Sequence, residues 1–113
     1  MHEVSIMQEI LDVAFDYAQR ERAIEITEIT ITIGKMSGVV PLALEFAFSA
    51  LIQDTLAHHA QLKINLLPLI CHCDFCQENF MPNEWFFLCP KCEQLSNKII
   101  QGKEIQLTSL KVS

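Results

Sequence analysis

The stretch CDFC at residues 73–76, followed by CPKC at residues 89–92, decides how this chain is organised. In each motif two residues separate the cysteines, so that both sulfurs of a tight turn point at one centre. Twelve residues lie between the motifs, enough for a short hairpin that brings the second turn back onto the first. Four thiolates placed in this way form a closed tetrahedral site, the usual arrangement for structural zinc. The sequence therefore predicts a zinc site whose ligands are Cys73, Cys76, Cys89 and Cys92.

Two other uses of paired cysteines fit this chain less well. A redox Cys-x-x-Cys motif is normally single and lies at the start of a helix next to a βαβ pattern. Two disulfides would suit a secreted chain, whereas five cysteines, an odd number with metal-like spacing, fit a reducing compartment. We therefore favour zinc over both alternatives and expect the protein to be cytoplasmic.

The composition restricts the class of protein further. The 113 residues suffice for one domain with a small insertion, and because half of them are hydrophobic and only 19% are charged, we expect a packed core. The apolar runs are too short to span a bilayer, and we expect no signal peptide. The formal net charge of −6, without any cluster of lysine or arginine, argues against a nucleic-acid partner.

The amino-terminal third predicts one helix and one strand. Ser5 and Gln8 form a capping box for a helix that begins at Ile6, and apolar residues recur at helical spacing to about Ala18. From 27 to 33 the period changes to two, and β-branched residues alternate with polar ones. This pattern predicts a strand with one buried face.

The remaining segments complete a small α+β body. Pro41 suits the first turn of a helix from Leu42 to about Leu56, which is apolar nearly all round and should be buried on more than one side, by the body or by a partner. Strands are predicted at 62–66 and from 105 to 112. The cysteine motifs fall between these two strands, so the zinc unit should be an insertion within one sheet.

The predicted fold class is therefore α+β, with two helices packed on a small three-stranded sheet and an inserted zinc-knuckle (rubredoxin-like) subdomain. Residues 1–68 and 99–113 should form the body, and residues 69–98 the insertion. An insertion of this length is too small to fold by hydrophobic burial, so metal binding should supply much of its folding energy.

His2 admits two interpretations. The simpler is that a residue at position 2 is frayed and has no role. The chemical alternative is that the Met1 amine, the His2 amide nitrogen and the His2 imidazole form fused chelate rings in one plane. Nickel(II) and copper(II) accept such a nitrogen set, and zinc(II) does not favour it. Glu3 would then complete the plane through its amide or add its carboxylate.

Other conspicuous residues also allow two readings each. His58 and His59 should be surface residues, with an accessory metal role as the alternative. Cys71 and His72 flank the first cysteine motif and should be spare side chains, although either could replace a zinc ligand. The apolar run at 85–88 should form the small core of the zinc unit, with a partner-binding patch as the alternative.

The order of these motifs along the chain resembles the HypA/HybF hydrogenase maturation factors. The matching segments are MHE at 1–3 with Ser5, Gly34, SGVVP at 37–41 and the two cysteine motifs. Members of that family are nickel metallochaperones for the nickel-iron hydrogenase active site. The resemblance implies a nickel site on Met1, His2 and Glu3, and structural zinc on the four cysteines.

The resemblance also implies partners, namely a maturation GTPase of the same pathway and the hydrogenase large subunit as recipient. A homodimer is compatible with the sequence, whereas nucleic acid and membrane are not expected partners. Two features depart from the family pattern. Gln77 stands where the family usually has glycine, which should strain that turn, and the helix exit at 54–60 lacks the family's glycines.

Two functional hypotheses from different classes follow. The first is a nickel carrier that inserts its metal through protein contact. The second is a zinc-ribbon adaptor that binds proteins without carrying a transferable metal. An enzyme is disfavoured, because the paired thiols are committed to metal and no nucleophile–base set or open catalytic zinc position is visible.

Overall fold

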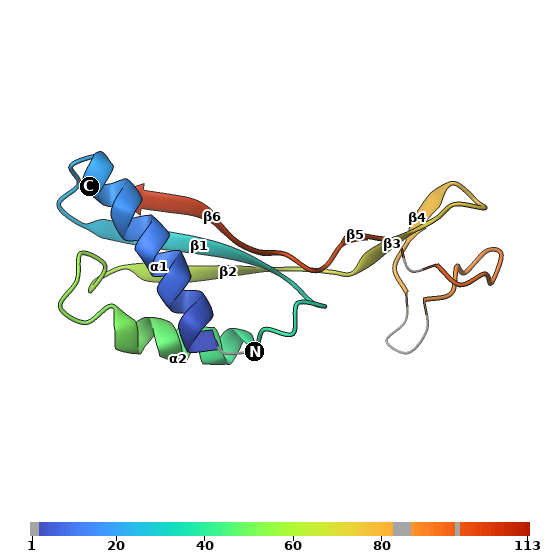
Figure 1. Ribbon diagram of the computed structural model, residues 1–113, viewed down its shortest axis with the longest axis horizontal. Helices are drawn as coiled ribbons and strands as arrows, with labels where there is room; N and C mark the ends of the chain where they lie inside the picture. Colours follow the sequence, from blue (N-terminus) through green and yellow to red (C-terminus); the bar gives the residue numbers. More distant parts are fainter. Residues whose placement is uncertain (1–2, 83–86, 97) are drawn as a thin grey trace.

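The computed structural model describes residues 3–82, 87–96 and 98–113, which form two lobes joined by a narrow neck (Figure 1). Its extents are 55 × 25 × 17 Å, and its radius of gyration is 17.6 Å. A compact domain of this length would have a radius of gyration of about 13 Å. The molecule is therefore elongated because its lobes lie end to end.

The larger lobe, called the body, contains two helices and a three-stranded sheet, and the smaller one, called the metal lobe, contains a second three-stranded sheet. The elements of the body are α1 (Glu3–Arg20), β1 (Ile26–Gly34), α2 (Pro41–Leu51), β2 (Gln61–Leu67) and β6 (Ile105–Val112). The elements of the metal lobe are β3 (Ile70–Cys73), β4 (Glu78–Phe80) and β5 (Ile99–Gln101). The α+β fold class and the cysteine-bearing insertion are thus confirmed.

Helix α1 packs one apolar face against the sheet and α2. Its buried residues recur at helical spacing and are Met7, Ile10, Leu11, Ala14 and Ala18. The predicted start at Ile6 is wrong, because Ser5 already lies within the helix and cannot cap it. Instead, the Glu3 carboxylate accepts a hydrogen bond from the backbone N–H of Val40 at 3.2 Å, which ties the beginning of α1 to the beginning of α2.

Strand β1 is the centre of the body sheet, whose order is β2-β1-β6. It pairs in parallel with β2, with α2 as the crossover between them, and antiparallel with β6. Ile29, Ile31 and Ile33 are completely buried, as the alternating pattern predicted.

The opposite face of β1 is also largely buried, so the prediction of a single buried face is wrong. Thr30 and Thr32 are only 9% and 8% exposed. Neighbouring side chains cover them, since Thr32 forms a hydrogen bond with Thr108 at 2.9 Å. Nearby, Glu28 forms ion pairs with Lys63 at 3.1 Å and Lys111 at 3.5 Å, which join all three strands.

Helix α2 is shorter than predicted, because it ends at Leu51 and not near Leu56. A turn follows in which Asp54 has a positive φ of 59°, a conformation that no helix interior contains. The side chains that face the body are buried, namely Leu44, Ala47 and Phe48. On the outer side Leu42 and Phe46 are 61% and 70% exposed, so the body alone buries only one side of α2.

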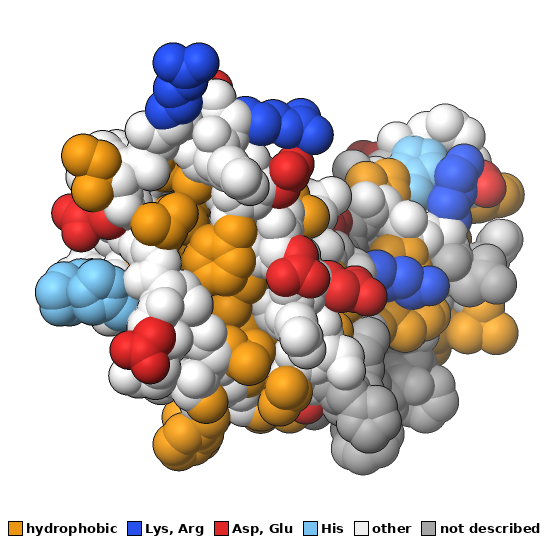
Figure 2. All heavy atoms as spheres, turned by 60° about the vertical axis from the view of Figure 1, so that its left-hand side comes forward, with side chains coloured by type: hydrophobic (Ala, Val, Ile, Leu, Met, Phe, Trp, Pro, Cys, Tyr) orange, Lys and Arg blue, Asp and Glu red, His pale blue; other side chains and the backbone are white. Residues whose placement is uncertain are grey.

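Apolar exposure of this kind is not confined to α2. Figure 2 shows that hydrophobic side chains form a band down the middle of the face in view, with acidic side chains on both sides.

Within the described ranges, no helix combines the length and the apolar composition that crossing a membrane requires.

The neck is a short set of backbone contacts around Gly34 and Gly102. The Gly34 N–H donates to the Glu104 carbonyl at 2.8 Å, and the Met36 N–H donates to the Gly102 carbonyl at 2.7 Å. A Cβ on Gly34 would lie 2.0 Å from the carbonyl carbon and oxygen of Gly102. The chain therefore needs glycine at position 34 because two backbones meet there.

The chain passes the neck twice, from β2 into β3 and from β5 back into β6 (Figure 1). In the metal lobe β3 lies between β4 and β5, and both pairings are antiparallel. Strand β5 therefore takes part in the second sheet, with Ile99 opposite Cys71. The division into a body at 1–68 and 99–113 and an insertion at 69–98 stays a prediction.

Candidate metal centre

Two tight turns carry the four cysteines. Cys73 ends β3, and the turn that contains Cys76 leads back into β4, with Cys73 opposite Glu78 in the antiparallel register. The second motif also forms a tight turn, which is closed by a hydrogen bond of 2.8 Å from the Glu93 N–H to the Cys89 carbonyl. Each cysteine pair therefore sits on a closed turn, as the spacing predicted.

A left-handed residue follows each turn. Gln77 has a φ of 56° and Glu93 a φ of 60°, and each comes directly after the second cysteine of its pair. For a residue with a Cβ this conformation costs about 1–2 kcal/mol. The departure from glycine at Gln77 therefore does place a strained residue in the turn.

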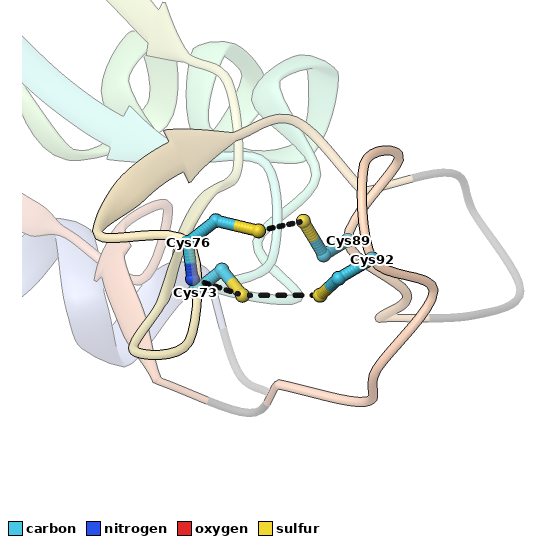
Figure 3. A group of neighbouring side chains, drawn as sticks. All are labelled: Cys73, Cys76, Cys89 and Cys92. Atoms are coloured by element: carbon cyan, nitrogen blue, oxygen red, sulfur yellow. Dashed lines mark hydrogen bonds between the residues drawn. The ribbon is translucent and has the colours of Figure 1, made fainter.

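The four sulfurs converge on one point between the turns (Figure 3). All lie within 4.8 Å of one another; the Sγ atoms of Cys73 and Cys92 are 3.5 Å apart, and those of Cys76 and Cys89 are 3.9 Å apart. Four sulfurs around zinc at about 2.3 Å have edges of about 3.8 Å, whereas a disulfide holds its sulfurs at about 2.0 Å. The cluster therefore fits a tetrahedral ion and contains free thiols.

Backbone N–H groups face the sulfurs. The Cys76 N–H donates to Cys73 Sγ at 3.4 Å. At Cys89, hydrogen bonds from the backbone N–H groups of Cys92 and Lys91 lower the thiol pKa to about 7, against the effect of burial. Such hydrogen bonds favour the thiolate, which is the form that binds metal.

Once one thiol of the cluster is ionised, ionisation of a second thiol is unfavourable. Desolvation and the hydrogen bonds that the Cys76 thiol makes with the other three sulfurs raise the pKa of Cys76 to about 12. At Cys92 the Gln94 N–H acts to lower the pKa, but burial and the hydrogen bonds with Cys73 and Cys89 leave it raised. Four thiolates can therefore coexist here only when a cation lies between them.

Ion pairs and hydrogen bonds surround the cluster. Lys91 and Glu78 form an ion pair at 2.6 Å that joins the two turns, and Glu78 raises the pKa of Lys91. Asp74 lies 3.2 Å from Lys98, and His72 Nδ1 lies 2.7 Å from Asn79 Oδ1. These contacts hold the turns from outside, and nothing in the spacing of the cysteines indicated them.

Cys71 and His72 stay outside the sulfur cluster. The Cys71 side chain is completely buried beside β4 and β5, and this burial raises the pKa of its thiol. Among the described residues, the four cysteines of the two motifs form the one group of at least three potential metal ligands. The structure therefore brings together the four predicted zinc ligands and leaves out the two flanking residues.

The predicted nickel residues are only partly described. Met1 and His2 lie outside the described residues, so their nickel role stays a prediction. Glu3 opens α1, and its carboxylate contacts the Val40 N–H.

His58 and His59 lie side by side in the turns after α2, with ring centroids 3.9 Å apart. His58 Nδ1 lies 2.8 Å from the Thr55 carbonyl oxygen, which can only accept, so this nitrogen is the donor. Both histidines are exposed, as predicted. Their accessory metal role stays a prediction.

Comparison with known proteins now adds to this geometry. Residues 1–112 match the family described as "Hydrogenase/urease nickel incorporation, metallochaperone, hypA". The chain belongs to this family. HypA is thus the family that the motifs predicted, and its description is that of a metallochaperone and maturation factor.

Individual HypA relatives match over nearly their full length. The hydrogenase maturation factor HypA of Picosynechococcus sp. is 47% identical over 112 residues, with 99% of each chain covered. That of Aquifex aeolicus is 37% identical, with 99% of this chain and 97% of the relative covered.

A similar fold occurs in the solution structure of the nickel metallochaperone HypA from Helicobacter pylori. Its TM-score is 0.70 at 27% identity, with 99% of this chain and 97% of that chain covered. A second HypA solution structure gives a TM-score of 0.76 at 26% identity, with coverage of 100% and 97%. The HypA fold thus includes both lobes.

Proposed function

We propose that this protein is a nickel metallochaperone that delivers Ni(II) for the maturation of a nickel-iron hydrogenase. Membership of the HypA family across residues 1–112 is the observation that carries this proposal. In this role nickel is cargo, and the zinc held by the four cysteines is structural. A closed set of four thiolates suits this division, since it leaves no open coordination position for exchange.

The proposed nickel ligands are the Met1 amine, the His2 amide and imidazole, and a group of Glu3. The Glu3 amide is the better candidate of its two groups, because the carboxylate contacts the Val40 N–H at 3.2 Å. The amide belongs to the first turn of α1, where the helix dipole favours negative charge and therefore the loss of the amide proton. Nickel(II) accepts a square plane of such nitrogens.

Delivery requires contact with other proteins. We propose a maturation GTPase of the same pathway and the large subunit of a hydrogenase as partners, in the cytoplasm. The exposed Leu42 and Phe46 on the outer side of α2 offer an apolar surface for such contact.

The deciding experiment is a nickel titration of the untagged protein with its zinc site already filled. One equivalent of nickel should produce a diamagnetic, yellow, square-planar complex, and binding should release protons. His2→Ala should abolish this signal while zinc content stays unchanged.

His58→Ala is the matched control, since it also removes one imidazole from the body, and it should leave the square-planar signal intact. Glu3→Gln should have a smaller effect than His2→Ala if Glu3 contributes its amide. A His2→Ala protein that still forms the complex at full stoichiometry would exclude the proposed ligands. A wild-type protein that holds zinc but no nickel would favour the zinc-ribbon adaptor.

A further inference from the structure

A furrow runs along the outer side of the body between α1 and β6. Three adjoining hollows form it, and neighbouring hollows share Tyr17, Leu107 or Leu110 as lining residues. They follow the chain from Ile105 to Ser113, a length of about 27 Å for an extended strand. The furrow is therefore long and narrow, a shape that fits an extended segment.

One wall of the furrow is an open sheet edge. Strand β6 is the outermost strand of the body sheet (Figure 1), and within the described ranges no further strand pairs with its outer side. Edge strands are often protected by a charged residue or a proline. Strand β2, at the opposite edge, carries Lys63 near its middle, whereas β6 has the neutral residues Thr108 and Ser109 there. The unpaired backbone of β6 is thus suited to accept another strand.

The other wall is a stripe of residues on α1 at steps of four. Val13 and Tyr17 form its apolar centre and are 60% and 50% exposed. Glu9 and Glu21 line its two ends, and Glu21 continues the helical turn because its N–H donates to the Tyr17 carbonyl at 3.0 Å. Four residues of an α-helix rise by about 6 Å. The stripe therefore presents an acidic, two apolar and an acidic side chain at intervals of about 6 Å.

The acidic ends favour a basic ligand. In the described part of the chain, neither Glu9 nor Glu21 forms an ion pair. Arg22 lines the hollow beside Glu21, whereas Glu9 is the one charged residue among the described lining residues of its own hollow. A basic group should therefore gain more at the Glu9 end than at the Glu21 end.

A β-strand has the spacing that complements this stripe. Side chains on one face of a strand recur at every second residue, about 6.8 Å apart. Four of them extend over about 20 Å, which is close to the rise of about 18 Å from Glu9 to Glu21 along the helix. A strand with basic, apolar, apolar and basic residues on one face can therefore meet all four residues of the stripe.

We propose that the furrow binds an extended segment of another protein that adds a strand to the body sheet beside β6. The segment has the pattern basic-x-apolar-x-apolar-x-basic, in which basic is lysine or arginine. Its backbone pairs with β6, its two apolar side chains contact Val13 and Tyr17, and its two basic side chains meet Glu9 and Glu21.

A second copy of this chain cannot supply such a segment. The pattern requires two basic residues six positions apart, and no pair among the eight lysine and arginine residues of the sequence has this spacing. The partner is therefore a different protein. The proposal does not depend on the proposed nickel function, because the furrow contains none of the proposed metal ligands, so either can fail without the other.

A synthetic peptide with the pattern tests the proposal. The peptide is Lys-Thr-Val-Thr-Val-Thr-Lys, blocked at both ends and labelled with a fluorophore, and its anisotropy is measured against the zinc-loaded, full-length protein. Binding should saturate at one peptide per chain and weaken as salt is added. A peptide of the same composition with both lysines in the centre is the control and should bind at least about tenfold more weakly.

N-methylation of the peptide tests whether its backbone pairs with β6. In a strand, alternate N–H groups point to the same side, so only one alternating set can donate to β6. Methylation of that set should abolish binding, and methylation of the other set should leave it unchanged. Equal binding of the two methylated peptides would exclude strand addition.

Substitutions on α1 test the side-chain contacts. Val13→Ser should weaken binding by about five- to tenfold. Val4→Ser is the matched control, because it makes the same change at a 56% exposed position of the same helix outside the furrow, and it should bind like the wild type. Circular dichroism and zinc content should be the same in both variants, which separates lost binding from unfolding.

Charge exchange at Glu9 tests the ion pair. Glu9→Gln should weaken binding by about 1.5- to 5-fold, more than Glu21→Gln does, because Arg22 adjoins Glu21. Glu9→Lys should weaken it further, and a peptide with one terminal lysine replaced by glutamate should recover it. The end at which this replacement succeeds gives the direction of the added strand.

Three results would overturn the proposal. The first is a wild-type protein that does not bind the peptide, or that binds the control peptide equally well. The second is an equal loss of binding in Val13→Ser and Val4→Ser. The third is a Glu9→Lys protein whose binding neither glutamate-containing peptide recovers.

Discussion

The two lobes of this molecule differ in what their cores contain, although one narrow neck joins them. The body has a continuous core to which both helices and all three strands contribute. Within the described part of the metal lobe, the buried residues are Cys71, Cys73, Phe80 and Cys89, and three of these four are cysteines. Hydrophobic burial can therefore fold the body, whereas the described core of the metal lobe consists mainly of cysteines, so we expect metal binding to supply much of the folding energy of that lobe.

We expect metal coordination to stabilise the smaller lobe. Structural zinc contributes apparent binding energies of about 10–16 kcal/mol in small zinc-finger peptides at neutral pH. A contribution of this order exceeds the strain of the left-handed Gln77 and Glu93, at about 1–2 kcal/mol each. A lobe stabilised by a metal ion can therefore tolerate this local backbone strain.

Removal of the metal is the strongest test of this contrast. Chelation, or Cys92→Ser, should unfold the metal lobe while the body keeps its structure. Hydrogen exchange should then show lost protection in β3 to β5 and retained protection in β1. Cys71→Ala is the matched control, because Cys71 lies outside the sulfur cluster, and it should retain one zinc per chain. Simultaneous unfolding of both lobes would show that they are not independent.

Acidification should weaken zinc binding in the metal lobe at pH values where the body is still folded. Metal binding requires thiolates, and in the metal-free protein Cys76 has a pKa raised to about 12, while that of Cys89 is lowered to about 7. Binding therefore displaces the Cys76 proton across the neutral range, and below about pH 7 it must also displace the Cys89 proton.

We accordingly expect zinc affinity to fall as the pH falls, and more steeply below about pH 7 than above it. Competition with a chromophoric chelator over a pH series measures this dependence. Cys71→Ala should give the same curve, since its thiol is not a ligand. A constant affinity between about pH 6 and about pH 8 would contradict the assignment of thiols as ligands.

Leu44→Ala should act on the body alone. Leu44 is completely buried, so its truncation should lower the free energy of unfolding by about 2–5 kcal/mol. Denaturant unfolding measures the loss, and zinc content should not change. Leu42→Ala, on the 61% exposed side of the same helix, is the control and should have a much smaller effect. Equal losses of unfolding free energy in the two variants would contradict the assignment of Leu44 to the core.

Gly34→Ala tests how firmly the neck joins the lobes. The new Cβ would lie 2.0 Å from Gly102, and we expect a loss of about 1–3 kcal/mol with faster hydrogen exchange at the Met36 amide. Gly38→Ala separates this clash from backbone strain, because Gly38 has a φ of 82° but no atom within 4 Å of an added Cβ. It should leave exchange at Met36 unchanged.

Patterns of local origin were predictable from the sequence. The cysteine spacing predicted the sulfur cluster, and the alternation at Ile29, Ile31 and Ile33 predicted the buried face of β1. The buried face follows from alternation within one strand, and the cluster follows from the spacing within and between two short motifs. The family was likewise predictable, because its motifs occur in order over the whole chain.

Features that depend on distant segments were not predictable. Ser5 suggested a cap, but Glu3 contacts Val40, so the helix begins earlier. Thr30 and Thr32 read as solvent-facing, but cross-strand neighbours bury them. The shortened α2 and the role of β5 in a second sheet also arise from tertiary contacts. Intrinsic patterns yield to such contacts wherever the two conflict.

The return of the chain through the neck also has a kinetic consequence. The body sheet is complete only when β6 pairs with β1, with Val112 opposite Ile26. Because the whole metal lobe lies between β2 and β6 in the sequence, this pairing joins segments that are far apart along the chain. That pairing closes a long loop, and the entropy of closure rises with loop length, by about 0.6 kcal/mol for each doubling. A metal ion that joins Cys73 to Cys92 removes the segment between them from this loop. We therefore expect zinc to accelerate folding of the body, a lobe that contains none of the zinc ligands.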